Sequence, residues 1–166
     1  MKSKSFAGMR CSIAGALEAL GDRWAILVLR DLAFGLRRYD EFRDSLGIPT
    51  TTLATRLKHL EAHGLVARAR YQERPPREEY RLTEKGHDLW KVMTALREWG
   101  DRWDATGYGA PSIELVDRRT GREVCLGLVD PKTGRGVARE RVKLRLGRGA
   151  DASTRFLFNR INGAET

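Results

Sequence analysis

The sequence has 166 residues, of which 41% are hydrophobic, so it has room for one domain with an appendage and enough apolar residues for a folded core. Lys and Arg outnumber Asp and Glu by 31 to 22, and this surplus favours a polyanionic partner such as nucleic acid or an anionic membrane surface. No apolar run approaches the roughly 20 residues that span a bilayer, and residues 1–10 precede no stretch typical of a signal peptide. Two cysteines and three scattered histidines fit neither a disulfide framework nor a metal site. We therefore expect a cytoplasmic protein without a metal or other cofactor.

Three helices are expected in the first third of the chain, because apolar residues recur at helical spacing between glycines. Ser12 is positioned to cap the first helix, which ends at Gly21. Asp22 then caps a second helix, which Gly35 stops. A shorter third helix is expected over Tyr39–Leu46.

A fourth helix is expected from Pro49 to about His63, since proline is favoured at the first positions of a helix. Leu53, Leu57 and Leu60 are spaced i, i+4 and i+7, which defines a buried stripe. The opposite face carries Thr51, Thr55, Lys58 and His59, with Thr52 and Arg56 on its shoulder.

The periodicity changes after Gly64, where residues 65–71 and 78–82 alternate as strands around a basic tip, residues 72–77. This pattern predicts a β-hairpin. A long helix is then expected from about Glu84 to Trp103. It carries more apolar surface than a small domain needs from a terminal helix, namely Leu89, Val92, Met93, Leu96, Trp99 and Trp103.

Beyond Gly107 the sequence predicts short strands over residues 113–116, 124–129 and 141–146, separated by turns around Thr120-Gly121 and Thr133-Gly134. The two turns share an x-Thr-Gly centre with similar flanks, a weak internal repeat. From Gly147 onward the chain is a basic tail whose apolar residues 156–158 fit a short helix. The expected fold class is mainly α with small β: a winged helix-turn-helix domain plus a short β-rich C-terminal extension.

The expected order of elements, helices followed by a hairpin with a basic tip, is that of winged helix-turn-helix proteins. These proteins place one helix in the major groove of DNA. Short hydroxyl side chains let that helix approach base edges, and guanidinium groups in the wing suit phosphate or the minor groove. The candidate DNA-binding residues are Arg38, Thr50, Thr51, Thr52, Thr55, Arg56, Lys58, His59, Arg70, Arg74 and Arg77. An alternative interpretation is that the Thr-rich face is simply solvated and that Arg68 and Arg70 form the wet face of a hairpin.

Six segments resemble the HxlR family of bacterial winged-helix regulators, a MarR-like group. They begin with Cys11-Ser12-Ile13 and Gly21-Asp22-Arg23-Trp24, include Leu53-Ala54-Thr55-Arg56-Leu57, and end with the run from Pro75 to Gly86. The match covers about residues 10–104 in order and at the expected spacing. It implies a domain over 1–108, an extension over 109–147 and a basic tail over 148–166.

The resemblance also implies a homodimer, assembled through the first helix and the long last helix, with one DNA-reading helix per subunit. The expected interface residues are Ile13, Leu17, Leu20, Leu89, Val92, Leu96, Trp99 and Trp103. In some family members the extension resembles a small zinc ribbon. Here the corresponding turns, Arg119-Thr120-Gly121 and Lys132-Thr133-Gly134, lack cysteine ligands, so no metal is expected.

In several members of the family a cysteine at the position of Cys11 senses oxidants. The backbone N–H groups at a helix start favour a thiolate, and Arg10 would add to that effect. The alternative is a small apolar residue packed at the dimer seam. Cys125 lies in a predicted strand and is expected in a core rather than as a partner for Cys11.

Other functions are less well supported by the sequence. The chain has no P-loop, no GxSxG elbow, no HExxH and no His/Cys/carboxylate cluster, so we do not expect an enzyme. RNA or single-strand binding usually needs exposed aromatic residues, and here only Tyr71 and Phe156 are candidates. A protein-interaction module on the same fold is the third possibility. The sequence thus favours a dimeric regulator of double-stranded DNA, responsive to a small molecule or a redox signal.

Overall fold

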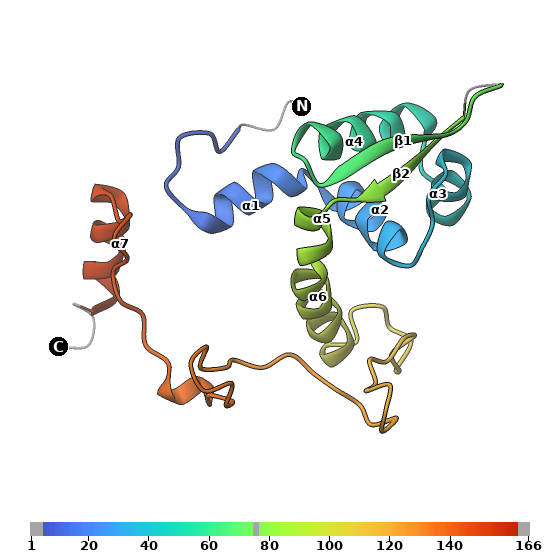
Figure 1. The fold of residues 1–166 in the computed structure, drawn as a ribbon. Coiled ribbons are helices and arrows are strands. Elements are labelled where there is room, and N and C mark those ends of the chain that lie inside the picture. The colour runs from blue at the N-terminus through green and yellow to red at the C-terminus, as the bar shows by residue number, and fades with distance from the viewer. Residues whose placement is uncertain (1–4, 75–76, 163–166) are drawn as a thin grey trace. The chain divides into compact units, whose positions relative to one another are not determined.

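A computed structural model describes residues 5–74 and 77–162 of the chain (Figure 1). Its elements are, in chain order, α1 (Ser12–Leu20), α2 (Arg23–Ala33), α3 (Tyr39–Leu46), α4 (Thr50–Ala62), β1 (Val66–Gln72), β2 (Arg77–Leu82), α5 (Glu84–Asp88), α6 (Trp90–Arg102), a 3-10 helix (Arg139–Arg141) and α7 (Ala152–Asn162). The mainly helical fold with a small sheet is confirmed. Pro75 and Pro76 of the expected hairpin tip, and residues 1–4 and 163–166 of the expected domains, lie outside the described residues.

The chain packs into two compact units. The first comprises the described parts of residues 1–87 and 145–166, and the second comprises residues 88–144. The expected boundary at residue 108 falls inside the second unit, because α6 groups with the extension that follows it. The division into 1–108, 109–147 and 148–166 therefore stays a prediction. Within residues 5–74 and 77–162, no helix is both long and apolar enough to cross a bilayer.

The core of the first unit is built on α4, whose apolar stripe is confirmed. Leu53, Leu57 and Leu60 are at most 1% exposed, and α4 contacts α1, α2, α3 and β1. Fully burying each such side chain contributes about 1.5–3 kcal/mol. The remaining buried apolar residues come from the same stretch of chain: Ala14, Leu20, Ala25, Val28, Leu29, Leu32, Phe42, Ile48, Leu65 and Val66.

The helix boundaries follow local sequence signals, with one exception. Asp22 caps α2 as expected, since its carboxylate accepts hydrogen bonds from the N–H groups of Trp24 and Ala25 at 3.0 and 3.1 Å. Ser12, however, does not cap α1. The carbonyl of Cys11 already accepts the N–H of Gly15 at 3.0 Å, so Cys11 is the N-cap and Ser12 the first helical residue.

The predicted hairpin forms, shifted by one residue at its start. β1 and β2 are antiparallel with Val66 opposite Leu82, and the register shifts between Arg70 and Gln72. Leu65 is a buried connector rather than part of β1, because its N–H donates to the carbonyl of Leu60 at 2.9 Å. Strand β2 is also tied to the loop before α3, since the N–H of Tyr80 donates to the carbonyl of Arg37 at 2.7 Å.

The expected continuous helix from Glu84 to Trp103 is wrong, because the structure divides it into α5 and α6 at Leu89. Gly86 holds α5 against the end of the hairpin. A Cβ at this position would collide with the carbonyl oxygen of Leu65, so only glycine fits. The hydroxyl of Thr83 caps α5 by accepting the N–H of Gly86 at 3.1 Å.

The extension is less regular than predicted. Its expected strands are reduced to two isolated bridges, Val116 with Glu123 and Val129 with Gly136, each of which closes one x-Thr-Gly turn. Residues 139–141, at the start of the last expected strand, form a 3-10 helix instead. Because only one bridged residue pair flanks each turn, most backbone groups of the extension have no neighbouring strand, and no sheet forms. The apolar residues of the tail do form a helix, α7.

Candidate nucleic-acid interface

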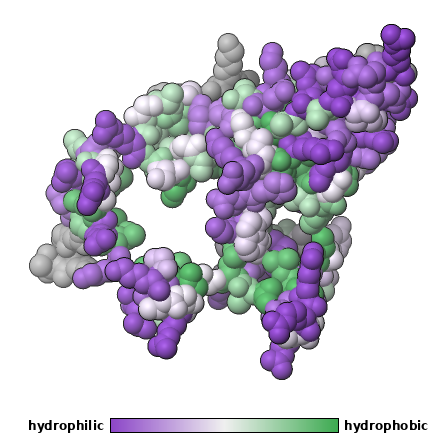
Figure 2. Space-filling model, viewed as in Figure 1, coloured by the Kyte–Doolittle hydropathy of each residue, from purple (hydrophilic) through white to green (hydrophobic). Residues whose placement is uncertain are grey.

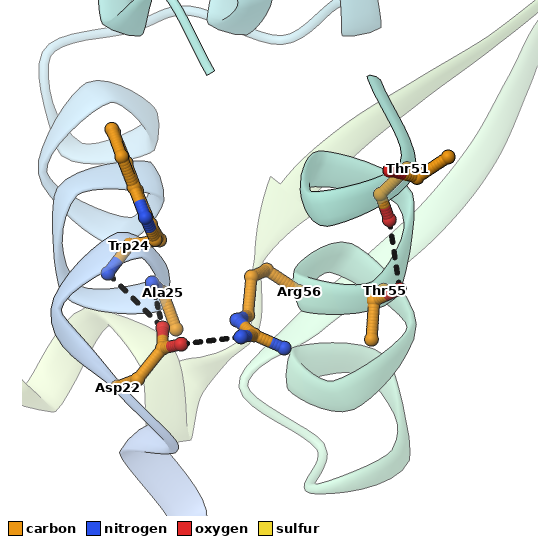
Figure 3. Close-up of polar contacts among 6 residues, drawn as sticks. All are labelled: Asp22, Trp24, Ala25, Thr51, Thr55 and Arg56. Atoms are coloured by element: carbon orange, nitrogen blue, oxygen red, sulfur yellow. Dashed lines mark hydrogen bonds and ion pairs between the residues drawn. The ribbon is translucent and has the colours of Figure 1, made fainter. Parts of the chain in front are cut away.

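One face of α4 is exposed along its length and carries short side chains. Thr51, Thr55 and Lys58 are exposed, as predicted. The hydroxyl of Thr55 donates to the carbonyl of Thr51 at 2.8 Å, so this side chain presents mainly its methyl group (Figure 3). Ala54 is exposed on the same face and was missed by the sequence argument, although its helical position next to Lys58 would have identified it. Such a surface permits close approach of the helix to base edges.

Arg56 does not belong to this exposed face. Its guanidinium forms an ion pair with Asp22 at the start of α2, and its Nε is buried (Figure 3). Burial raises the pKa of Asp22, but the hydrogen bond from the N–H of Ala25 and the contact with Arg56 outweigh it and leave that pKa below its ordinary value of 3.8. Arg56 therefore fixes α4 to the α1–α2 corner.

His59 lies one turn further along α4 on the same side as Arg56. Its Nε2 is 3.1 Å from the carbonyl oxygen of Ala19 in α1. A Cβ on Gly21 would come within 2.9 Å of this nitrogen, so glycine at the end of α1 allows the imidazole to pack there. His59 thus packs against α1, whereas Lys58 lies on the exposed face, so the prediction of DNA contact is better supported for Lys58. Thr52 is half-buried and lies between the exposed face of α4 and the side that carries Arg56 and His59.

The start of α3 is linked to both α4 and the hairpin. The hydroxyl of Tyr39 donates to the carbonyl of Thr50 at 2.6 Å, which holds the exposed start of α4 in place. The guanidinium of Arg38 lies over the ring of Tyr71 on β1, 5.0 Å from its centroid. A cleft of about 370 Å³ is lined here by Arg38, Tyr39, Asp40, Tyr71, Arg77 and Glu78.

The basic side chains of the hairpin differ in how far they are neutralised. Arg68 pairs with Glu78 at 3.0 Å, and Arg70 pairs with Glu73 at 3.3 Å. Among the described residues, Arg38, Lys58, Arg74 and Arg77 have no carboxylate within 4.0 Å. The hairpin and α3 together present an almost continuous hydrophilic surface, at the upper right of Figure 2. Of the predicted cations, these four are the ones free to meet an anion.

An exposed α4 face beside a basic hairpin is the geometry of winged helix-turn-helix proteins. The family model for the HxlR-like helix-turn-helix matches residues 19–108, more than half of the chain. The chain belongs to the HxlR-like helix-turn-helix family. Its fold is accordingly that of helix-turn-helix transcriptional regulators.

Similar proteins carry names that agree with this HxlR-like assignment. The uncharacterized HTH-type transcriptional regulator Rv3095 of Mycobacterium tuberculosis is 44% identical over 100 residues, which are 60% of this chain and 63% of that protein. The chain thus matches somewhat less than two thirds of the length of that relative. The crystal structure of PA1607 superposes with a TM-score of 0.71 at 34% identity, over 87% of this chain and 99% of that one. The reduced form of the redox regulator HypR superposes with a TM-score of 0.53 at 32% identity, over 59% of this chain and all of its own.

The expected dimer residues of this HxlR-like chain are mostly exposed. On α1, Ile13 is 72% exposed and Leu17 is 46% exposed, whereas Leu20 is only 6% exposed and belongs to the core of its own subunit. On α6 and at its ends, Val92, Leu96, Trp99 and Trp103 are exposed and Leu89 is half-buried. Hydrophobic surface is visible on the segment that contains α6 (Figure 2). Apart from Leu20 and half-buried Leu89, these side chains are not covered by the described part of their own chain.

Both cysteines are free and exposed. The expectation that Cys125 lies in a core is wrong, because the strand predicted around it does not form and the extension buries no apolar side chain there. Cys11 is exposed at the N-cap of α1, beside residues that we expect at the dimer seam.

Proposed function

We propose that this HxlR-like chain is a transcriptional regulator that binds duplex DNA as a homodimer. In this proposal α4 of each subunit enters a major groove, and the operator is a palindrome. The observation that carries the proposal is the exposed face of α4, made of Thr51, Ala54, Thr55 and Lys58, next to a hairpin with free arginines. The names of the relatives support it.

Dimerisation is proposed because two helices expose apolar side chains that their own subunit leaves uncovered. Trp99 and Trp103 are 62% and 64% exposed, and Ile13 of α1 is more exposed still. Apolar side chains exposed together on one helix, as on α6, mark protein interfaces, and most homodimers are two-fold symmetric. To meet successive major grooves, such a dimer has to hold its two α4 helices about 34 Å apart.

The sharpest test of DNA reading introduces a carboxylate on the exposed α4 face. Thr51→Glu places a negative charge at the N-terminal part of α4, where recognition helices meet base edges. Ala62→Glu adds the same charge at the other end of the helix, also at an exposed position. Binding to a duplex from the promoter next to the protein's own gene is then measured by fluorescence anisotropy.

We expect Thr51→Glu to abolish specific binding and Ala62→Glu to leave most of it. Both variants should fold, because neither position is buried. Circular dichroism and thermal unfolding verify this. Equal binding by wild type and Thr51→Glu would show that α4 does not read DNA. Binding to single-stranded RNA in preference to the duplex would favour the alternative nucleic-acid function.

A redox response through Cys11 is the second candidate function. The thiol is exposed at a helix start, on the helix that we place at the dimer seam, so its oxidation can change the spacing of the two α4 helices. The similarity to a redox regulator, HypR, supports this. Diamide should alter the DNA affinity of wild type and not that of Cys11→Ser. An equal change in both proteins would exclude Cys11 as the sensor.

A further inference from the structure

The positive charge of the chain is unevenly distributed. Residues 109–147, the extension, contain nine Lys and Arg against five Asp and Glu, a net charge of +4. Residues 1–108 contain 19 against 15, which is also +4, although they are nearly three times as many. All the basic residues of the extension are exposed. The extension is thus the most basic part of the molecule for its length.

The two parts also differ in how their cations are paired. In the described chain every ion pair joins residues between Asp22 and Asp101, and none involves the extension. The helix-turn-helix region therefore neutralises much of its charge internally, whereas the extension does not. Unpaired cations on a surface are available to an external polyanion, and they release counterions when they bind it.

Two of the five acidic residues of the extension, Asp117 and Asp130, bind backbone N–H groups of its turns rather than its cations. One oxygen of Asp117 accepts the N–H groups of Arg119 and Thr120, both at 2.8 Å. These hydrogen bonds, from Thr120 first and then Arg119, hold the pKa of Asp117 below its ordinary value. Asp130 likewise accepts the N–H of Lys132 at 2.8 Å. Both carboxylates thus act inside their own turns.

The two turns are copies of one another. We call them the first turn (Asp117–Arg122) and the second turn (Asp130–Arg135). In each, the N–H of the glycine donates to the carbonyl of the leading Asp at 2.8 Å, and the glycine has a positive φ, 68° in the first turn and 67° in the second. Both then end in an exposed arginine. The weak sequence repeat is therefore a structural repeat that presents cations at matching positions.

We propose that the extension is a second DNA-contacting element, which binds the phosphate backbone without reading sequence through the cations of its two turns. The inference rests on the proposed function, because duplex DNA is the polyanion that an HxlR-like chain is expected to meet. Arginine suits phosphate because its planar guanidinium forms paired hydrogen bonds. Contacts of this kind fix affinity and position rather than specificity.

The test compares two double variants of the full chain. Arg119→Gln with Arg122→Gln removes two unpaired cations from the first turn. The matched control, Arg43→Gln with Arg81→Gln, removes two exposed arginines that already pair with Asp44 and Glu79. Affinity for a duplex of about 40 base pairs without an operator, long enough for two half-sites and flanks, is measured over a range of salt concentrations.

We expect the first-turn variant to bind more weakly. Its plot of log affinity against log salt concentration should also be less steep, by about 0.9 for each lost phosphate contact. The control should keep a slope close to that of wild type. Adding Lys132→Gln and Arg135→Gln should flatten the slope further, because the second turn repeats the first. Each variant is also examined by sedimentation, since the extension exposes apolar residues such as Ile113 and Leu144.

The outcomes separate this inference from the function on which it rests. If wild type binds no duplex at all, the proposed function fails. If wild type binds and the turn variants keep its slope, the extension does not contact DNA and only this inference is overturned. It is also overturned if the flatter slope accompanies conversion of a dimer to a monomer, or if the variants lose binding to anionic vesicles and not to DNA.

Discussion

Residues 5–87 and residues 88–144 differ in whether they are complete on their own. In the described chain every buried apolar side chain lies between Ala14 and Val66, and α4 packs against four neighbouring elements. The second region buries Thr94 but leaves Leu96, Trp99 and Trp103 largely exposed. Outside α6, its backbone hydrogen bonds join residues at most nine positions apart. One region encloses its apolar side chains, whereas the other leaves most of its own exposed.

The comparison indicates how the two regions divide the work. The region with a closed core positions α4 rigidly through the contacts of Arg56 and His59 with the α1–α2 corner. The open region exposes apolar side chains on α6, where we propose that a second subunit binds, and unpaired cations on the extension. In the proposed function, the helix that reads DNA and the helix that forms the dimer thus occupy successive parts of one chain.

The largest expected effect contrasts two leucines on helices of the two regions. Leu57→Ala should lower the free energy of unfolding by about 2–5 kcal/mol, because it leaves a cavity in the core. Leu96→Ala should lower apparent stability only through a weaker dimer, so its effect should depend on protein concentration. Urea unfolding at several concentrations measures both. A concentration-independent loss of similar size in both variants would remove the distinction between the regions.

The next effect concerns assembly through α6. Trp99→Ala should raise the dimer dissociation constant by about 30-fold, equivalent to about 2 kcal/mol, as expected for a central interface tryptophan. Trp90→Ala is the matched control, since Trp90 is also exposed but lies on the opposite side of the helix by its spacing. Sedimentation equilibrium gives the constants. Equal constants for the two variants would place the interface elsewhere.

A smaller effect tests the ion pair that holds α4. Asp22→Asn keeps a side chain able to cap α2 but removes the charge, so it should cost at most about 1 kcal/mol near neutral pH for a partly exposed pair. The folded pKa of Asp22 lies below its ordinary value of 3.8. Its contribution is therefore present above that value and is lost as the pH falls through the folded pKa. Urea unfolding should show a smaller difference in the free energy of unfolding between wild type and variant at about pH 3 than at pH 7. A constant difference would mean that the charge does not matter.

The smallest effect concerns the hairpin. Arg74→Ala should weaken binding to all duplexes alike and flatten the salt slope by about 1. Arg70→Ala should change less, because Arg70 is already paired with Glu73. A loss confined to one DNA sequence would mean that Arg74 reads bases rather than phosphates.

The sequence was sufficient to predict the first region and only partly the second. The positions of α2, α3 and α4 follow from caps, glycines and the spacing of Leu53, Leu57 and Leu60, all of which are local signals. The engagement of Arg56 and His59 could not be predicted, because their partners Asp22 and Ala19 meet them only after folding. In the extension, alternating residues predicted strands, but a strand needs neighbours and the described chain supplies only single bridges.

The most direct test of the central claim is selection of binding sites by the full protein from a random duplex library. A dimer that reads DNA through two α4 helices should enrich an inverted repeat with half-site centres about 10 base pairs apart. Thr51→Glu should enrich none. Enrichment of a single unrepeated half-site, or the same repeat with Thr51→Glu, would contradict the account.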